Sequence, residues 1–265
     1  MRIGITIIFN GLCHLQHNDY AERLLEMLDY WIIVEGAAGN SGSTSWCKEM
    51  PKKYHNNGSS IDGTVEFLRE FGAANIDKVS VVLATGIWKS KDEMINRSLK
   101  SLYYMGTPVY LWQIDIDEQW TKEQMDEAEY DLICSYDDTG MFLCDCYVGK
   151  YLLAKGEWGE GKQLPYRRLW RWKGQSFISH EPPILKGGNG KEILLSQRFK
   201  HYPYYFLQDI NFKEDYYGYE GLYKRWKDLQ KETKFPQPIN RLIPGKWGES
   251  NTEIIHMWGL NEVQT

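Results

Sequence analysis

The residues best suited to chemistry are three carboxylates near the middle of the chain. Asp115, Asp117 and Glu118 follow an apolar run at residues 109–114. If that run continues as a strand through the first two acids, Asp115 and Asp117 point to the same face. Carboxylates held together repel each other unless a cation lies between them. Oxygen ligands suit Mn²⁺ or Mg²⁺, so we expect a site for one of these ions. The alternative is a solvated acidic turn.

The elements that must position these acids alternate in type along the first half of the chain. Apolar runs predict buried parallel strands, and amphipathic segments between them predict helices. This alternation predicts an α/β fold with a mostly parallel central sheet flanked by helices. Ligands bind such sheets beyond the carboxyl ends of the strands. Strands are expected at residues 3–9, 30–35, 79–83 and 109–114, and helices at 18–28, 62–71, 91–102 and 121–130.

The remaining segments are less regular. Residues 36–60 are rich in Gly, Ser and Asn and predict a long loop, and loops of that length are usually functional or mobile. After residue 133 the pattern predicts short strands at 166–172 and 176–179. Residues 196–232 are aromatic and charged, and we predict that they are mostly helical.

Composition narrows the class of protein. The net charge of −5 gives no reason to expect binding to nucleic acid, and without a run of 18 apolar residues no membrane span is expected. Five cysteines show no disulfide framework, which fits a cytoplasmic protein. Cys144 and Cys146 form a single close pair, too little to predict zinc.

The charges are distributed unevenly along the chain. Residues 115–145 hold eleven carboxylates and one base, whereas residues 150–235 hold seventeen bases and ten acids. This asymmetry fits a metal site beside a phosphate-facing half, or two solvated surfaces of opposite sign.

Four short segments of the first half carry a family resemblance. They are Phe9-Asn10, Glu35, Lys91 with Asn96, and Asp115-x-Asp117-Glu118. In this order they resemble the family-2-like branch of the GT-A-type glycosyltransferases. The likeness covers about the first 135 residues and departs at two positions. Gly11 stands where the branch usually has an acid, and Glu35 where it usually has Asp.

The second half adds two segments of the same branch. Residues 168–171 read R-L-W-R, and His180-Glu181 matches its H-E pair. In those enzymes the Glu of this pair lies near the acceptor, so the resemblance implies that Glu181 is the general base. A later His often completes the metal site, and His201 fits that position best, with His256 as the runner-up. An ordinary ion pair for Glu181 and an ordinary hydrogen-bonded role for His201 are the alternatives.

The resemblance implies a GT-A-like, Rossmann-like fold. Residues 1–135 would bind the nucleotide-sugar, and residues 136–265 would form a smaller β and helical lobe on the acceptor side of the same domain. Lys213 would help bind the diphosphate, and a solvated helix charge is the alternative reading of this residue. The implied donor-binding residues are Phe9, Asn10, Glu35, Lys91, Asn96, Asp115 and Lys213, and the implied metal ligands are Asp115, Asp117 and His201.

The expected reaction is sugar transfer from a UDP-, GDP- or dTDP-sugar to a glycan or lipid-linked glycan. One base on the far side of the sugar carbon predicts single displacement with inversion. A sugar-phosphate nucleotidyltransferase is an alternative, but residues 10–14 lack the basic loop it would carry. A D-x-D phosphohydrolase would carry its motif after the first strand. A non-catalytic carbohydrate-binding protein is the third alternative.

Overall fold

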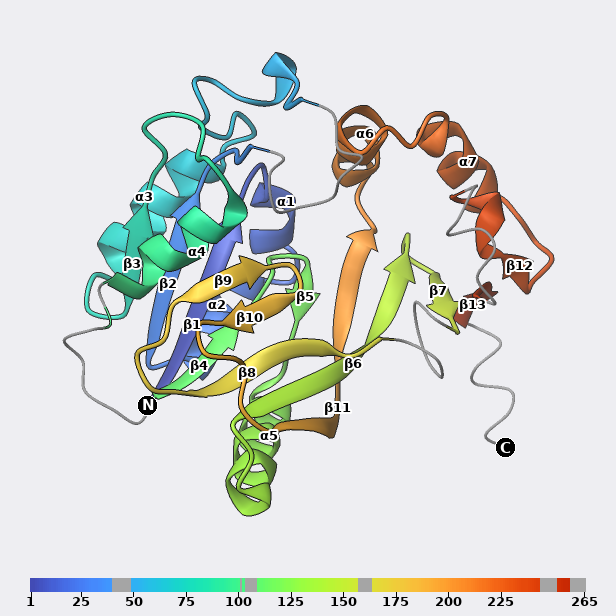
Figure 1. The fold of residues 1–265 in the computed structure, drawn as a ribbon. Coiled ribbons are helices and arrows are strands. Elements are labelled where there is room, and N and C mark those ends of the chain that lie inside the picture. Colours follow the sequence, from blue (N-terminus) through green and yellow to red (C-terminus); the bar gives the residue numbers. More distant parts are fainter. Residues whose placement is uncertain (40–48, 101, 103–108, 157–163, 244–251, 258–265) are drawn as a thin grey trace. The chain divides into compact units, whose positions relative to one another are not determined.

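The computed structural model describes residues 1–39, 49–100, 102, 109–156, 164–243 and 252–257 (Figure 1). The chain forms two compact units. Unit 1 comprises residues 1–142 and 166–197, and unit 2 comprises residues 143–165 and 198–265. The division falls inside two long strands, β6 (Thr139–Val148) and β11 (Glu192–Tyr204).

Unit 1 contains the elements that hold most of the predicted site residues. Its other strands are β1 (Arg2–Ile8), β2 (Tyr30–Glu35), β3 (Val79–Val82), β4 (Val109–Gln113), β5 (Glu118–Gln119), β8 (Tyr166–Trp172), β9 (Phe177–His180) and β10 (Pro183–Leu185). Its helices are α1 (Leu12–Leu15), α2 (Tyr20–Met27), α3 (Thr64–Ala74), α4 (Lys91–Leu99) and α5 (Lys122–Ser135), with the 3₁₀ turn η1 (Lys52–Tyr54).

The sheet of unit 1 is mixed, which corrects the prediction of a mostly parallel sheet. Its strands follow the order β6-β8-β4-β1-β2-β3. Strands β4, β1, β2 and β3 are parallel, as the alternation predicts. Strand β8 is antiparallel to both β4 and β6. Parallel neighbours need a long crossover, usually a helix, and no helix separates β6 from β8 among the described residues.

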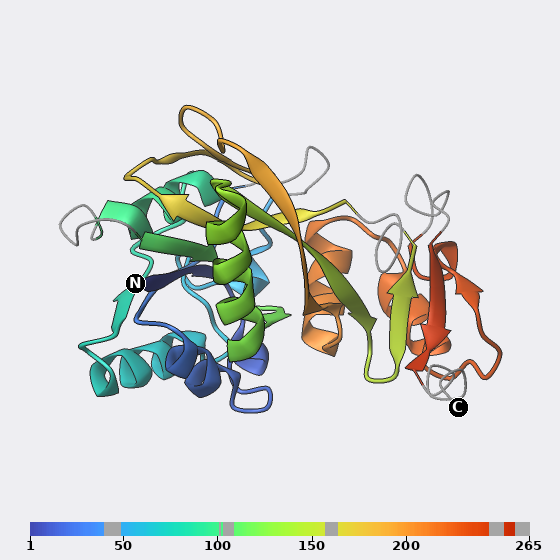
Figure 2. The same cartoon turned by 90° about the horizontal axis from the view of Figure 1, so that it is seen from below.

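Helices cover both faces of the parallel strands, because side chains alternate between the faces. Ile5 and Ile32 belong to a buried cluster that also contains Ile95 and Leu99 of α4. Trp31 points to the opposite face, where its ring contacts Phe71 of α3 edge to face at 6.0 Å. Figure 2 shows α2 and α3 on one side of these strands and α4 on the other.

Two helix predictions have clear outcomes. The helix predicted at residues 121–130 is found as α5, and it begins with a capping box, because the side chains of Thr121 and Gln124 each bond the backbone of the other residue. The prediction of helix from residue 196 is wrong for its first part. There β11 continues as a strand to Tyr204, with alternating burial over most of its length. The helical pattern therefore begins only after Tyr204, at α6.

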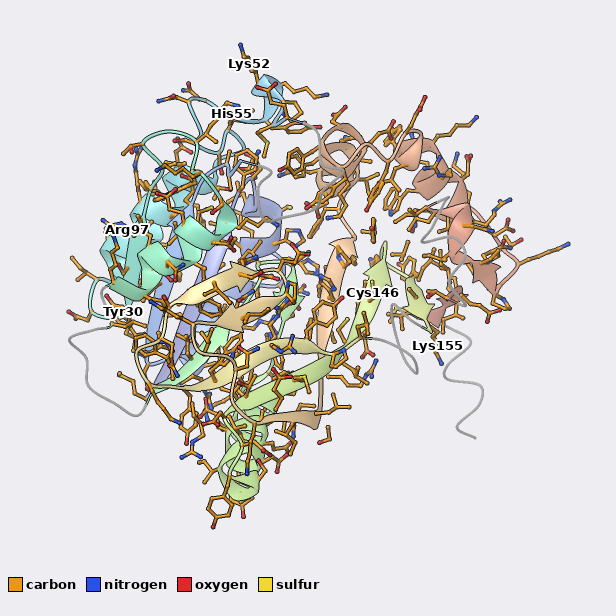
Figure 3. All side chains as sticks on the ribbon, viewed as in Figure 1. Tyr30, Lys52, His55, Arg97, Cys146 and Lys155 are labelled. Carbon is orange, nitrogen blue, oxygen red and sulfur yellow. The ribbon has the colours of Figure 1, made fainter. Side chains whose placement is uncertain are left out.

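The described part of unit 2 contains a small antiparallel sheet and two α-helices. Strand β13 (Glu253–His256) lies between β7 (Leu152–Lys155) and β12 (Gln237–Pro238), and β7 also pairs with β6. Cys146 of β6 lies opposite Ala154 of β7, and Cys146 and Lys155 are both labelled in Figure 3. The helical elements are α6 (Leu207–Tyr216), α7 (Leu222–Leu229) and the 3₁₀ turn η3 (Ile239–Arg241).

Neighbouring side chains lie so close to Gly4 of β1 that a substitution there tests the packing of the core. A Cβ atom at Gly4 would lie 2.5 Å from Leu28 Cδ1 and 3.2 Å from Trp31 Cδ1. We expect Gly4→Ala to lower the free energy of unfolding by about 1–3 kcal/mol through overpacking, measured by urea denaturation. Gly86→Ala is the control, because a Cβ there meets nothing within 4 Å. Equal effects of the two substitutions would contradict the packing.

Candidate active site

The predicted acids lie in a turn and not on a strand. Strand β4 ends at Gln113, and the amide of Glu118 donates to the carbonyl of Asp115 at 2.9 Å, which closes a four-residue turn. The inference that Asp115 and Asp117 share a strand face is therefore wrong. The Asp115 side chain is 30% exposed, and Asp117 is half-buried.

A buried arginine contacts two of the three carboxylate residues in this turn. The Nη2 of Arg168, on β8, lies 2.7 Å from Asp115 Oδ2 and 2.6 Å from Glu118 Oε1. The Nε of Arg168 donates to both oxygens of Glu118, at 2.9 and 3.0 Å. The Glu118 side chain is completely buried, and that of Arg168 is 4% exposed. Burial alone would lower the pKa of Arg168, but the two carboxylates raise it above its ordinary value.

His180 lies beside the same turn, at the end of β9. Its Nε2 is 4.0 Å from Asp115 Oδ1 and 3.4 Å from the amide nitrogen of Gln113. Burial lowers the pKa of His180 to about 4, with help from the charges of Lys91 and Arg168 and against the opposing charge of Asp115. His180 is therefore neutral near pH 7. Within the described part of the chain, His180 Nδ1 and Gln113 Oε1 are buried without a hydrogen-bond partner.

Lys91 and Glu181, predicted separately from the sequence, lie close together. Lys91 begins α4, and its Nζ is 3.5 Å from Glu181 Oε2. The Glu181 side chain is 54% exposed, so its carboxylate is accessible to solvent. The residues next to Lys91 and Glu181 also link α4 to β9, because the amide of His180 donates to Asp92 Oδ1 at 2.6 Å.

Asn96, on the same helix, has both ends of its amide in use. Its Nδ2 donates to the carbonyl of Phe177 at 2.8 Å, and its Oδ1 accepts from the amide of Phe177 at 2.8 Å. These bonds hold α4 to β9. Asn96 thereby fixes the strand that carries His180.

A second group of predicted residues lies at the carboxyl ends of β1 and β2. The Glu35 carboxylate is completely buried and accepts from the amides of Ser60, at 2.7 Å, and Ala84, at 3.3 Å. Asn10, just after half-buried Phe9, donates from Nδ2 to the carbonyl of Tyr54 at 2.7 Å. Asn10 and Glu35 thus organise the chain that connects β2 to α3.

The same connection touches a second loop through backbone atoms. We call residues 49–63 the β2–α3 segment and residues 83–90 the β3–α4 segment. Gly58 in the first has a φ of +88°, and a Cβ there would lie 2.4 Å from the carbonyl group of Gly86 in the second. Lys52 and His55 of the β2–α3 segment are labelled in Figure 3, where Lys52 extends away from the sheet.

Three further predicted residues belong to unit 2. His201, on β11, has its Nδ1 3.9 Å from Cys144 Sγ. The Nζ of Lys213 lies over the rings of Tyr204, at 5.5 Å, and Tyr217, at 5.7 Å. His256, the runner-up to His201, stacks on a tyrosine ring at 6.2 Å. The grouping of His201 with Asp115 and Asp117 joins two units and stays a prediction.

Sequence reasoning missed the roles of Arg168, Glu118, Gln113 and His180 in this cluster. Arg168 and His180 were part of the quoted motifs, but only pairing between β4 and β8 brings the guanidinium to the turn. The one sequence signal was an arginine predicted to lie inside an apolar strand, since a charge there needs a buried partner.

Comparison with solved structures finds loose likenesses. The crystal structure of S. aureus TarS 1–349 in complex with UDP-GlcNAc has a TM-score of 0.45 and 10% identity, and the match covers 76% of this chain and 58% of that one. A second crystal structure of S. aureus TarS 1–349 has a TM-score of 0.44 and 12% identity, and the match covers 85% of this chain and 68% of that one. The crystal structure of mannose-6-phosphate isomerase from Helicobacter pylori has a TM-score of 0.33 and 14% identity, and the match covers 65% of this chain and 61% of that one. At these TM-scores the likeness supports no conclusion about fold or function.

No protein-family model matches the sequence, and no curated protein matches it either. The resemblance to the family-2-like glycosyltransferases therefore stays a prediction. Among the described residues, no helix is both long enough and apolar enough to cross a bilayer.

The low pKa of His180 predicts an acid-sensitive fold. The unfolded chain protonates this group below its ordinary pKa of 6.5, whereas the folded protein keeps it neutral down to about pH 4. The unfolded state binds more protons in that window, so stability falls as the pH is lowered through it. We expect the group to cost roughly 2 kcal/mol at pH 5. Urea unfolding at pH 7 and pH 5, without metal, should show a smaller loss in His180→Gln. Equal losses in both proteins would contradict this pKa.

Proposed function

We propose that this protein is a glycosyltransferase that moves a sugar from a nucleoside-diphosphate sugar to a hydroxyl acceptor. One observation carries the proposal: Lys91, Asp115, His180 and Glu181 lie together beside the carboxyl end of β4. This is the edge of a parallel sheet at which ligands bind. The group combines an accessible carboxylate, a cation and a polar turn, which transfer from a diphosphate requires.

The donor site in this proposal lies at the ends of β1, β2 and β4. Asn10 and Glu35 shape the β2–α3 segment by holding its backbone, and Phe9 precedes them. Because the Glu35 carboxylate is buried on backbone amides, we assign it to shaping this wall and not to direct contact with the base or ribose. UDP-, GDP- and dTDP-sugars are the candidate donors.

The residues of the turn fit a divalent cation that is shared with a diphosphate. Asp115 Oδ2 is bonded to Arg168, whereas its Oδ1 lies 4.0 Å from His180 Nε2. Asp117 would be the second ligand. Mg²⁺ and Mn²⁺ sites are commonly built from one or two carboxylates completed by substrate phosphates. When bound, the cation supplies positive charge to the leaving diphosphate.

Within unit 1, the described His, Cys, Asp and Glu residues form no group of three with ligand atoms close enough to hold an ion by themselves. A cation that needs the diphosphate to complete its ligands is consistent with this. Metal binding should therefore be much stronger with nucleotide than without it.

Glu181 is the proposed general base. Its carboxylate is exposed, and Lys91 lies 3.5 Å away. The base takes the proton of the acceptor hydroxyl as that oxygen attacks the sugar carbon, in one displacement that inverts the configuration. Lys91 would hold Glu181 in place before the donor binds and offer its charge to the diphosphate afterwards. Because His180 is neutral near pH 7, it adds no second positive charge beside Asp115.

A non-catalytic carbohydrate-binding protein is the second candidate, and one contact favours it. Arg168 already pairs with Asp115, which reduces the negative charge available to a cation. Under this alternative the protein binds sugar without nucleotide.

A ligand screen tests the proposal. We expect one class among UDP-, GDP-, dTDP- and CMP-sugars to raise the melting temperature in the presence of Mn²⁺, because a ligand that binds only the folded state stabilises it. The control is the same screen with EDTA, which should abolish the shift. Calorimetry that detects no nucleotide binding with or without metal would favour the carbohydrate-binding alternative.

Two substitutions separate binding from transfer. Asp117→Ala should abolish metal-dependent nucleotide binding, whereas Glu181→Gln should keep that binding and reduce transfer by about 100-fold or more. Calorimetry and a transfer or donor-hydrolysis assay measure the two effects. Glu123→Gln, on the exposed side of α5, is a matched acid-to-amide control that should change neither. Full transfer activity in Glu181→Gln would remove Glu181 from the role of base.

A further inference from the structure

The position of Asp115 is not set by its strand. Strand β4 ends two residues earlier, and one backbone bond closes the turn that contains Asp115. A side chain that is 30% exposed in a turn has several rotamers within reach. Its ion pair with Arg168, at 2.7 Å, is the contact that selects one of them.

Arg168 is itself held rigidly. Two of its nitrogens donate to the completely buried Glu118, at distances between 2.6 and 3.0 Å, and its Nη1 donates to the carbonyl of Arg167 at 3.2 Å. Because the guanidinium is planar and held at three nitrogens, the remaining N–H of Nη2 can point in only one direction. That direction ends at Asp115 Oδ2.

We propose that Arg168 and Glu118 are positioning residues that fix Asp115, so that Oδ2 is bound and Oδ1 faces the ligand. This inference rests on the proposed function, in which Asp115 contacts the donor and its cation. It also explains why Glu118 is buried. An arginine alone would cancel the charge of Asp115, whereas Arg168 and Glu118 together are neutral and leave the turn with the negative charges of Asp115 and Asp117.

The pair can be removed without leaving a buried charge. Losing only Arg168 would strand Glu118 in the interior, which is strongly destabilising, but a buried ion pair can often be replaced by apolar residues of similar volume with little loss of stability. Arg168→Met/Glu118→Leu is therefore the informative variant. It removes one positive and one negative charge, so the net charge around Asp115 is unchanged and only its anchor is lost.

An ion pair between the neighbouring residue of β8 and the start of β11 supplies a matched control. Arg167 and Glu192 form a two-pronged pair with distances of 2.7 and 2.9 Å and without contact to Asp115 among the described contacts of that pair. Arg167→Met/Glu192→Leu also removes one positive and one negative charge, the first from β8 beside Arg168 and the second from the start of β11. Arg168→Lys is the second comparison, because it keeps the charge but cannot reproduce the planar fork.

The experiment measures Mn²⁺ binding to the full chain by electron paramagnetic resonance, alone and with the nucleoside diphosphate from the screen. Loss of a residue that orients a metal ligand typically weakens binding 10- to 100-fold, and we expect that loss in Arg168→Met/Glu118→Leu and in Arg168→Lys. We expect wild-type affinity in Arg167→Met/Glu192→Leu. Urea unfolding of each variant verifies that the compared proteins are folded.

The outcomes separate this inference from the proposed function. If Arg168→Met/Glu118→Leu is folded and binds Mn²⁺ as the wild type does, while Asp115→Asn does not, the positioning role is overturned. Rescue by Arg168→Lys would show that only charge matters and would also overturn it. If the wild type binds no Mn²⁺, the proposed function fails, and crystal structures decide the inference. A displaced Asp115 side chain in the double variant supports it, and an unmoved one overturns it.

Discussion

A guanidinium group cannot lie in a protein interior without carboxylates to balance it, and the candidate site is organised by this constraint. Arg168 comes from an antiparallel strand, and Glu118 and Asp115 come from the turn that follows β4. The bonds among them tie the turn to the sheet. The positive charge also acts on His180, whose neutral form is favoured by burial and by Arg168 and Lys91. One ion pair thus sets both the shape of the turn and the charge around it.

The acids singled out by the sequence divide into two kinds. Glu35 and Glu118 are completely buried, and their oxygens hold backbone amides or a guanidinium. Asp115 and Glu181 keep exposed surface. Because a carboxylate that is saturated with hydrogen bonds in the interior has little left to offer a ligand, the proposed function assigns the chemistry to Asp115, Asp117 and Glu181. The buried pair builds the walls that the exposed pair needs.

Much of this arrangement was predictable from periodicity. The four parallel strands follow from apolar runs, and the start of α5 follows from a capping box at Thr121. The place of Asp115 beyond a strand was predictable, but its turn was not, because D-x-D-E reads as strand or turn with equal ease. The antiparallel course of β8 depends on pairing between residues more than 50 apart, as with Arg168 and Asp115. Local sequence carries no record of such pairing. Aromatic residues misled the prediction for β11, since alternate and helical spacing look alike in a short, dense run.

Gly58 has a consequence for how this protein could change. The backbones of the β2–α3 and β3–α4 segments approach each other so closely at Gly58 that no side chain fits between them. Glu35 bonds to both segments from below. A shift of one segment therefore requires a shift of the other, and the two segments form one structural unit. Grafting a new ligand preference onto this chain would require both segments to be exchanged together, with Glu35 kept beneath them.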